Sequence, residues 1–466
     1  MNTISHTHKN EITYLDVATN GNGPEKAVLT SSAIQRLNQL EYNILEVGPG
    51  GGSSINALGE YLGNLSGQAP KINLNLLELE NVKSQSLDDA MERISSFGES
   101  LLLSGNVVEL DNIAKPESMD IVSTSAVLHE VYSYNGGYGA LDRTLRGIAT
   151  TLKTGGYFAY RDVYSVETDN LHESANHAYN ADSSKSWLRF IKLFMPYYLN
   201  NGQHPYHHLE DHVKIKQGSL HIDSSDIDVN KDTLIRGPIG IMREIQRHYI
   251  TLRDDVWRTG TLGFIPELEG DKSNDWLNIK QGHKRVHFKF TDSDFLSFNQ
   301  KTLLTEMSER VSDHFVIDGD IFDAISDTAL NNFLETVQKG QDDSASEIWE
   351  DWQSREGRET YAYMTVDQLI GNIAIRSVEA SKNNDGAETI LLPEYITDVK
   401  KIPRTYYNRF LKKALSNPLF DGKQLILAKK IPLKDVDSIA TSLDVVQKYC
   451  SRETTASLYS LISSDV

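Results

Sequence analysis

The first third of the chain alternates short runs of consecutive apolar residues with longer amphipathic stretches. Apolar positions at helical spacing, such as Ala27, Leu29 and Ile34, predict helices around and between the apolar runs. Strands that alternate with helices form a parallel, doubly wound sheet, in which ligands bind at the carboxyl ends of the strands. The apolar runs predict strands within 42–47, 72–80, 100–110, 119–131 and 155–164, and the helices are expected at 25–40, 53–62, 82–97 and 140–152.

The alternation stops near residue 165 and sheet character returns near the end of the chain. Residues 291–311 and 326–338 have the clearest helical spacing between these two points. Near the end, a helix is expected after an N-cap at Thr365, and 423–431 is a strand. We therefore predict a core over 1–165, an inserted, mostly helical subdomain over 166–345, and a C-terminal part over 346–466 that completes the sheet.

Composition indicates a globular protein that is repelled by nucleic acid. The 466 residues are 39% hydrophobic and 24% charged, and 46 basic against 65 acidic residues give a net charge of −19. No run of apolar residues is long enough to span a membrane, and the N-terminus has no apolar core, so we expect a cytoplasmic protein. The single Cys450 excludes an internal disulfide and a cysteine-based zinc cluster.

The segment ILEVGPGGGSS, residues 44–54, places a glycine-rich turn between a predicted strand and a predicted helix. A phosphate-binding P-loop requires a lysine after the last glycine, where this chain has Ser53. The dinucleotide fingerprint is weakened because Ser53 also takes the place of its third glycine. The pattern that fits is an acid followed by alternate glycines: Glu46, Gly48, Gly50 and Gly52.

This pattern resembles the first motif of the class I (Rossmann-like) S-adenosylmethionine (SAM)-dependent methyltransferase superfamily. The resemblance continues in the family's order through Glu78 at the end of the second strand, with Glu80 as the alternative register. After the third strand the family usually has Gly-Asp, whereas this chain has Gly105-Asn106, which weakens the expected contact with adenine. Residues 119–134, 152–164 and 422–431 resemble the fourth motif, the fifth strand and the last, antiparallel strand.

The resemblance implies an α/β fold with a doubly wound, mostly parallel, seven-stranded sheet, and SAM as cofactor. A carboxylate at Glu78 is suited to the two ribose hydroxyls, and one at Glu46 supports the glycine turn and the cationic amino end of SAM. The expected cofactor-binding residues are Glu46, Gly48, Gly50, Gly52, Glu78, Leu79, Asn106, Val107 and Ser125.

Candidate catalytic residues follow the fourth and fifth strands. His129 lies where the family places the donor methyl group, and is a candidate base, with Glu130 beside it. Tyr132 and Tyr134 are candidates for aromatic walls of the sulfonium site. Alternatively, His129 has the structural role of capping the end of the strand, and the two tyrosines pack within a helix. Arg161, with Asp162, is a further candidate at the edge of the sheet, or else forms a structural ion pair.

The inserted subdomain is expected to hold the acceptor. It carries most of the histidines, including those of HPYHHLEDH, residues 204–212, which suit either a metal or a solvated loop. We assign no metal site from the sequence. The basic run 280–290 suits an anion or a solvated strand face, and Arg243 with Arg247 suits an anion clamp or ion pairs with Asp254 and Asp255.

The function predicted from the sequence is SAM-dependent methyl transfer to a small-molecule or peptide-derived acceptor, in specialised metabolism. The acceptor class includes nucleotide-like compounds, while nucleic acid and membranes are not expected partners. Transfer of the 3-amino-3-carboxypropyl arm of SAM is one alternative. An NAD(P)-dependent oxidoreductase or a non-catalytic SAM-binding module is another. The length of the insertion also suggests a lid that excludes water from the site.

Overall fold

The computed structural model describes residues 23–80, 82, 84–163, 171–267, 285–382, 388–400 and 422–464. The chain forms two compact units. The first unit is made of Met1–Asp169, Glu359–Val399 and Gly422–Val466, and the second of Asn170–Arg358 and Lys400–Asp421. The second unit therefore interrupts the first in the sequence. The described helices include none that is both long enough and apolar enough to cross a membrane.

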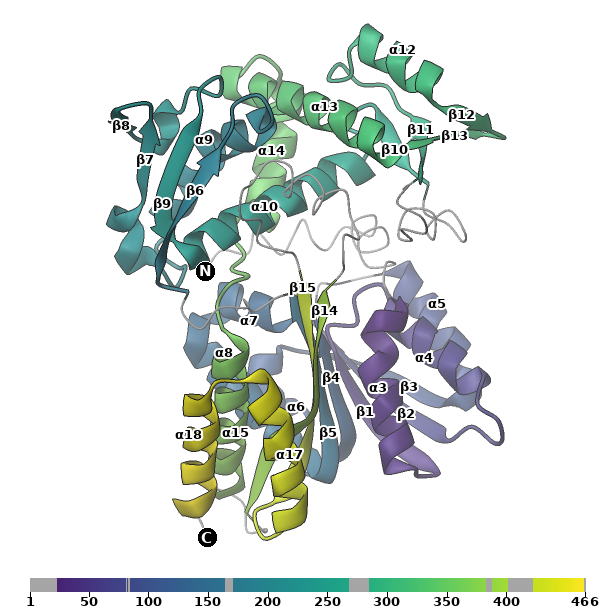
Figure 1. The fold of residues 1–466 in the computed structure, drawn as a ribbon. Coiled ribbons are helices and arrows are strands. Elements are labelled where there is room, and N and C mark those ends of the chain that lie inside the picture. The colour runs from purple at the N-terminus through teal and green to yellow at the C-terminus, as the bar shows by residue number, and fades with distance from the viewer. Residues whose placement is uncertain are drawn as a thin grey trace. The chain divides into compact units, whose positions relative to one another are not determined.

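A seven-stranded sheet forms the centre of the first unit, in the order β14-β15-β5-β4-β1-β2-β3 (Figure 1). The strands β3, β2, β1, β4 and β5 pair in parallel, and β15 pairs antiparallel with β5. Their bounds are β1 Glu41–Val47, β2 Lys71–Glu78, β3 Gly98–Ser104, β4 Met119–Ser125, β5 Leu152–Val163, β14 Thr389–Lys400 and β15 Gly422–Pro432. This confirms the doubly wound, mostly parallel sheet of the class I methyltransferase type.

The C-terminal part contributes two strands to this sheet, of which the sequence predicted only β15. The strand β14 lies at the edge of the sheet and contains Pro393. Proline has no N–H to donate to a neighbouring strand, so it is tolerated in an edge strand but breaks the pattern expected of a central one. The helix expected after Thr365 is confirmed as α15, Val366–Lys382, and the side chains of Thr365 and Gln368 cap it reciprocally.

Helices cover both faces of the sheet because alternate residues of each strand point to opposite faces. Ile44 of β1 packs with α3, α4 and α5, whereas the adjacent Leu45 packs with α7, α8, α15 and α17. These helices are α3 Gly23–Leu37, α4 Ser53–Gly63, α5 Gln85–Ile94, α7 Leu128–Asn135, α8 Gly137–Thr151, α15 and α17 Val436–Tyr449. The short α6, Leu110–Ile113, and the last helix α18, Arg452–Ser464, complete the helices described in this unit. Burial on both faces explains why apolar residues are consecutive in the strand centres, at Ile44 and Leu45 of β1 and at Ile121 and Val122 of β4.

The second unit combines long helices, as expected, with two small antiparallel sheets. Its helices are α9 Lys185–Asn200, α10 Ile239–Arg258, α12 Phe298–Met307, α13 Gly319–Lys339 and α14 Asp343–Arg355. One sheet has the order β6-β9-β7-β8: β6 Ser174–Tyr179, β9 Thr233–Pro238, β7 Lys214–Gln217 and β8 Leu220–Ile222. The other has the order β10-β11-β13-β12: β10 Phe264–Pro266, β11 Arg285–Phe290, β13 His314–Asp318 and β12 Glu309–Val311. Apart from β11, which falls in the basic run 280–290 for which a strand face was one interpretation, these strands are too short for their periodicity to identify them.

Candidate functional site

The glycine-rich turn lies at the carboxyl end of β1 and leads into α4. Gly48, Gly50 and Gly52 have φ values of +65°, +54° and +75°, which L residues with a side chain rarely adopt. A Cβ at Gly48 would lie 2.6 Å from Cγ2 of Val127, and one at Gly52 would lie 2.7 Å from the Cβ of Ala90. The backbone conformation therefore favours glycine at all three positions, and close packing also requires it at Gly48 and Gly52. No side chain caps α4, whose N-cap is Gly52.

Glu46 is buried beneath this turn, near the end of β1. Its carboxylate accepts a hydrogen bond of 2.9 Å from the Ser54 hydroxyl at the start of α4. Burial raises the pKa of Glu46, while hydrogen bonds from Ser123 and Ser54 and the charge of Lys26 oppose that rise. This carboxylate ties β1 to the first turn of α4.

Glu78 lies at the carboxyl end of β2 and faces the same turn. One carboxylate oxygen accepts the N–H of Leu79 at 2.9 Å, and the other accepts the N–H of Gly50 at 3.3 Å. Burial raises the pKa of Glu78 to about 7 against the lowering effect of these two N–H groups, and the charge of Glu130 raises it further. The carboxyl is only partly buried, and each of its oxygens has a second lone pair for a ligand. Glu80, in the alternative register, is exposed.

The remaining predicted cofactor residues surround the same edge of the sheet. Asn106 caps a short 3-10 helix by accepting the N–H of Val108 at 3.0 Å, and its amide donates to Asn135 at 2.6 Å. Its amide nitrogen has a second hydrogen that this bond does not use. Val107 is buried, Leu79 is partly buried, and the hydroxyl of Ser125 at the end of β4 accepts a hydrogen bond from Arg161.

Arg161 lies at the end of β5 and is buried in an ion pair with α3. Its Nε and Nη2 donate to one oxygen of Glu25, at 3.0 and 2.6 Å, and Nη1 donates to Ser125 at 3.0 Å. Its side chain is 1% exposed. The guanidinium therefore holds α3 against the strand ends.

Lys26 lies beside this ion pair and was not identified from the sequence. Its ammonium donates to the Ser53 hydroxyl at 2.9 Å, at the start of α4. Burial and the nearby Arg161 lower the pKa of Lys26 to about 8, against the raising effect of Glu46 and Glu25. The lysine adds positive charge to the end of α4 where the helix dipole is also positive.

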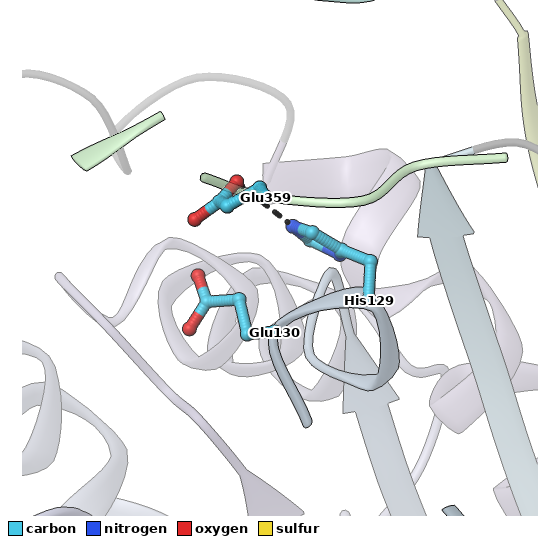
Figure 2. A group of neighbouring side chains, drawn as sticks. All are labelled: His129, Glu130 and Glu359. Atoms are coloured by element: carbon cyan, nitrogen blue, oxygen red, sulfur yellow. Dashed lines mark ion pairs between the residues drawn. The ribbon is translucent and has the colours of Figure 1, made fainter. Parts of the chain in front are cut away.

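His129 is the centre of a cluster that joins α7, the end of β5 and the segment before α15. Its Nδ1 lies 2.7 Å from a carboxylate oxygen of Asp162, and its Nε2 lies 3.5 Å from Oε2 of Glu359. The His129 ring and the neighbouring Glu130 side chain both extend from α7 toward Glu359 (Figure 2). Burial alone would lower the pKa of His129, but Asp162 and Glu359 together raise it to about 10.

Two tyrosine hydroxyls orient Glu359. Tyr361 donates to Oε2 at 2.7 Å and Tyr134 donates to Oε1 at 3.2 Å, and the Tyr361 ring also lies 5.3 Å from the His129 ring. Tyr134 therefore reaches the cluster, as a hydrogen-bond donor. Tyr132, in contrast, is buried in the core and packs against Tyr138 and Tyr363. The expectation that Tyr132 lines the sulfonium site is not supported by this position.

Glu359 and Tyr361 could not be identified from the sequence because 225 residues separate Glu359 from Tyr134. No motif marks the segment, and only the return of the chain to the sheet brings it to the cluster. Asp162 was identified as a charged residue at the functional edge, but its contact with His129 was not. The sequence signal for that contact is weak, since both residues simply follow neighbouring strands.

The histidine-rich segment of the second unit does not bring three ligands to one point. Nδ1 of His204 accepts the N–H of Tyr206 at 3.1 Å, and Nε2 lies 3.4 Å from Glu210. Burial and the neighbouring His207 and His208 lower the pKa of His204 to about 4. In the described part of the chain, the group of ligand atoms close enough for one metal ion is that of His129, Glu130 and Glu359.

Several basic residues of the second unit form ion pairs. Lys289 contacts Glu267 at 2.7 Å and Asp313 at 2.9 Å, which agrees with a solvated strand face, while 280–284 lies outside the described residues. Asp254 pairs with Arg258 and Asp255 pairs with Arg355. Arg243 and Arg247, both on α10, have partners of their own.

No family model matches this chain, and no curated protein does. Solved structures match part of it. They include a complex of the trans-methyltransferase CalH with S-adenosylhomocysteine, at 18% identity over 30% of this chain and 37% of that chain, with a TM-score of 0.23. A putative sarcosine dimethylglycine methyltransferase from Galdieria sulphuraria matches at 15% identity over 31% of this chain and 47% of that chain, with a TM-score of 0.23.

A putative SAM-dependent methyltransferase from Methanococcus maripaludis matches at 16% identity over 32% of this chain and 62% of that chain, with a TM-score of 0.23. The matched part thus spans less than two thirds of each of these three proteins. Likenesses this partial say nothing about activity.

Proposed function

We propose that this protein is a SAM-dependent methyltransferase that acts on a small-molecule or peptide-derived acceptor. The observation that carries the proposal is the position of Glu46, Glu78 and the glycine turn at adjacent strand ends of a class I methyltransferase sheet. A carboxylate that already holds the N–H of Gly50 has lone pairs left for two ribose hydroxyls. Two carboxylates so close to the turn would repel the pyrophosphate of a dinucleotide.

The residues of the site suit each part of SAM. Glu78 would accept the ribose hydroxyls, and the N–H groups of Leu79 and Gly50 hold its carboxylate in place for that role. Lys26 and the start of α4 supply positive charge for the carboxylate of the amino-acid end. The acidic Glu46 beneath the turn suits the positive amino group of that end.

The cluster around His129 would act on the acceptor. Bound SAM supplies an electrophilic methyl group, whose bond to sulfur breaks as its bond to the acceptor atom forms, leaving S-adenosylhomocysteine. The acceptor's proton must then pass to the protein. His129 holds a proton at neutral pH because Asp162 and Glu359 raise its pKa to about 10, so it is a poor base. A carboxylate of Glu130 or Glu359 is better placed to take that proton.

Product analysis tests this proposal. The protein is incubated with SAM and pools of hydroxyl- and amine-bearing metabolites, and the nucleoside products are identified by mass spectrometry. Methyl transfer forms S-adenosylhomocysteine in proportion to methylated acceptor. Formation of methylthioadenosine in its place would contradict methyl transfer and establish transfer of the aminocarboxypropyl arm. The Glu78→Ala variant is the control, and it should form the product more slowly.

A further inference from the structure

The cluster of His129, Glu130 and Glu359 has a property that binding of SAM does not require. One ligand atom from each of the three side chains lies within 4.8 Å of the other two. Atoms bound to one small divalent ion lie at most about 4.4 Å apart, because each is about 2.0–2.2 Å from the metal, so these three atoms are near the separation that one ion requires. Figure 2 shows the His129 ring directed at Glu359, with Glu130 projecting from the next position of α7.

Neighbouring residues hold the side chains of His129 and Glu359 in fixed orientations. Asp162 contacts Nδ1 of His129 at 2.7 Å, so Nε2 is the nitrogen that faces the two glutamates, and a metal ion bound there would replace the proton that Nε2 carries in its absence. The hydroxyls of Tyr134 and Tyr361 each hold one oxygen of Glu359. Carboxylates behind histidine ligands and hydrogen bonds to ligating carboxylates are the usual supports of a metal site.

The charges of the cluster also favour a cation. Three carboxylates, those of Glu130, Glu359 and Asp162, surround a single imidazole. The side chains of Glu359 and Asp162 are only 2% and 1% exposed, so water screens them little. Buried negative charge of this kind is costly unless cations pair with it or it coordinates a metal.

We propose that His129, Glu130 and Glu359 bind one divalent first-row transition-metal ion, such as Mn²⁺ or Zn²⁺. A ligand set of one imidazole and two carboxylates suits these ions, whereas Mg²⁺ and Ca²⁺ prefer oxygen ligands alone. Three protein ligands leave further coordination positions for an oxygen of another molecule. The site is distinct from the residues assigned to SAM, although Glu130 acts electrostatically on Glu78.

The role of the ion rests on the proposed function, whereas its binding does not. An acceptor hydroxyl bound to the ion would lose its proton more readily. If Glu130 binds the ion through one oxygen, its other oxygen would take that proton. The ion would thus select acceptors with an oxygen ligand beside the methylated atom, such as vicinal diols, catechols or hydroxy acids.

Titration of the chelator-treated full chain with Mn²⁺, followed by electron paramagnetic resonance, tests the site. We expect one tight site per chain that weakens at least about tenfold in Glu130→Gln and Glu359→Gln, because each removes a ligand. Asp162→Asn should also weaken it by about tenfold or more, by losing the support of His129. The matched control is Glu92→Gln, at an exposed position of α5, which should bind as the unmodified chain does.

Two outcomes would overturn the inference. One is the absence of Mn²⁺ and Zn²⁺ binding to the unmodified chain, and the other is equal affinity and stoichiometry in Glu130→Gln. Glu130 is partly exposed, so this variant should fold even if Glu359→Gln does not. The histidines of the second unit could bind metal weakly, but Glu130→Gln leaves them intact.

The same samples are also titrated with SAM. If SAM binds but metal does not, the metal site alone is wrong. If metal binds as predicted but SAM does not, the metal site stands and the proposed function fails. The two failures are therefore distinguishable.

Discussion

At the scale of single residues, the candidate site contains carboxyl groups that differ in burial and in hydrogen bonding. Glu46 is buried under the glycine turn, Glu78 is partly open, and Glu359 is buried and held by two tyrosines. Glu46 and Glu78 could be predicted as site residues from the sequence because each lies at the end of a recognisable strand. The sequence did not identify Glu359, because the contact that gives this residue its role depends on a distant part of the chain.

The pKa of Glu78 predicts how SAM binding depends on pH. Ribose hydroxyls donate hydrogen bonds to the ionised carboxylate, and burial raises the pKa of Glu78 to about 7. SAM affinity should therefore increase as the pH rises from about 6 to about 8 and should level off above that range. Titration calorimetry across this range measures the effect.

Glu78→Gln provides the control for this prediction. The glutamine amide does not titrate. The variant should therefore bind SAM more weakly, and its affinity should not change with pH around pH 7. The same upward slope in the variant would assign the pH dependence to another group. The opposite sign applies to stability: because the pKa of Glu78 is about 7 in the folded protein against an ordinary value of 4.5, the free energy of unfolding should fall as the pH rises from about 4.5 to about 7.

At the scale of elements, the turn between β1 and α4 was predictable in its position but not in its packing. The sequence shows where the glycines lie, whereas the neighbours of Gly48 and Gly52 come from α7 and α5. Similarly, β14 was not predicted because Pro393 breaks the sequence pattern expected of a strand. The proline is tolerated because β14 lies at the edge of the sheet. Patterns along one segment reveal its own conformation, but not the elements that pack against it.

Two glycines of α4 make a matched pair for testing the turn. Gly52→Ala should lower the free energy of unfolding by about 2 kcal/mol, because it forces a left-handed conformation and a close contact with Ala90. Gly59→Ala should raise it by about 0.5–1 kcal/mol, since a Cβ there meets nothing within 4 Å and alanine favours a helix. Urea unfolding measures both, and similar values for the two variants would contradict the account of the turn.

In the second unit, Asp327 joins three helices. Its carboxylate, on α13, accepts hydrogen bonds from Tyr249 of α10 and from Ser186 of α9, and contacts Arg253 at 3.5 Å. Asp327→Ala should cost at least about 2 kcal/mol of stability, because it removes the carboxylate beside a buried guanidinium.

The control for Asp327 is Asp254→Ala. Asp254 forms a partly exposed pair with Arg258 of the same helix, and such pairs contribute about 0–1 kcal/mol. Thermal unfolding of both variants gives the comparison. Equal losses would show that the buried network does not stabilise the unit more than a surface pair does.

At the scale of the whole molecule, the sequence predicted that an insertion divides the sheet-forming part of the chain and that the C-terminal part adds a strand to the same sheet. The first unit takes its strands from both sides of the second unit in the sequence, and β15 was predicted from its own apolar pattern. The two small sheets of the second unit were not predicted, since their strands are three to six residues long. Long apolar strands buried on two faces are recognisable, whereas short strands paired across loops are not.

Calorimetric titration of the purified protein with SAM, S-adenosylhomocysteine and NADH tests the claim that the strand ends of the first unit bind SAM. We predict one site per chain, micromolar or tighter for SAM or S-adenosylhomocysteine, with no comparable binding of NADH. Glu78→Ala should weaken SAM binding by about tenfold or more, because charged hydrogen bonds contribute about 1.5–3 kcal/mol, and Glu80→Ala should leave it unchanged. Tighter binding of NADH, or no binding of either SAM or S-adenosylhomocysteine, would contradict the claim.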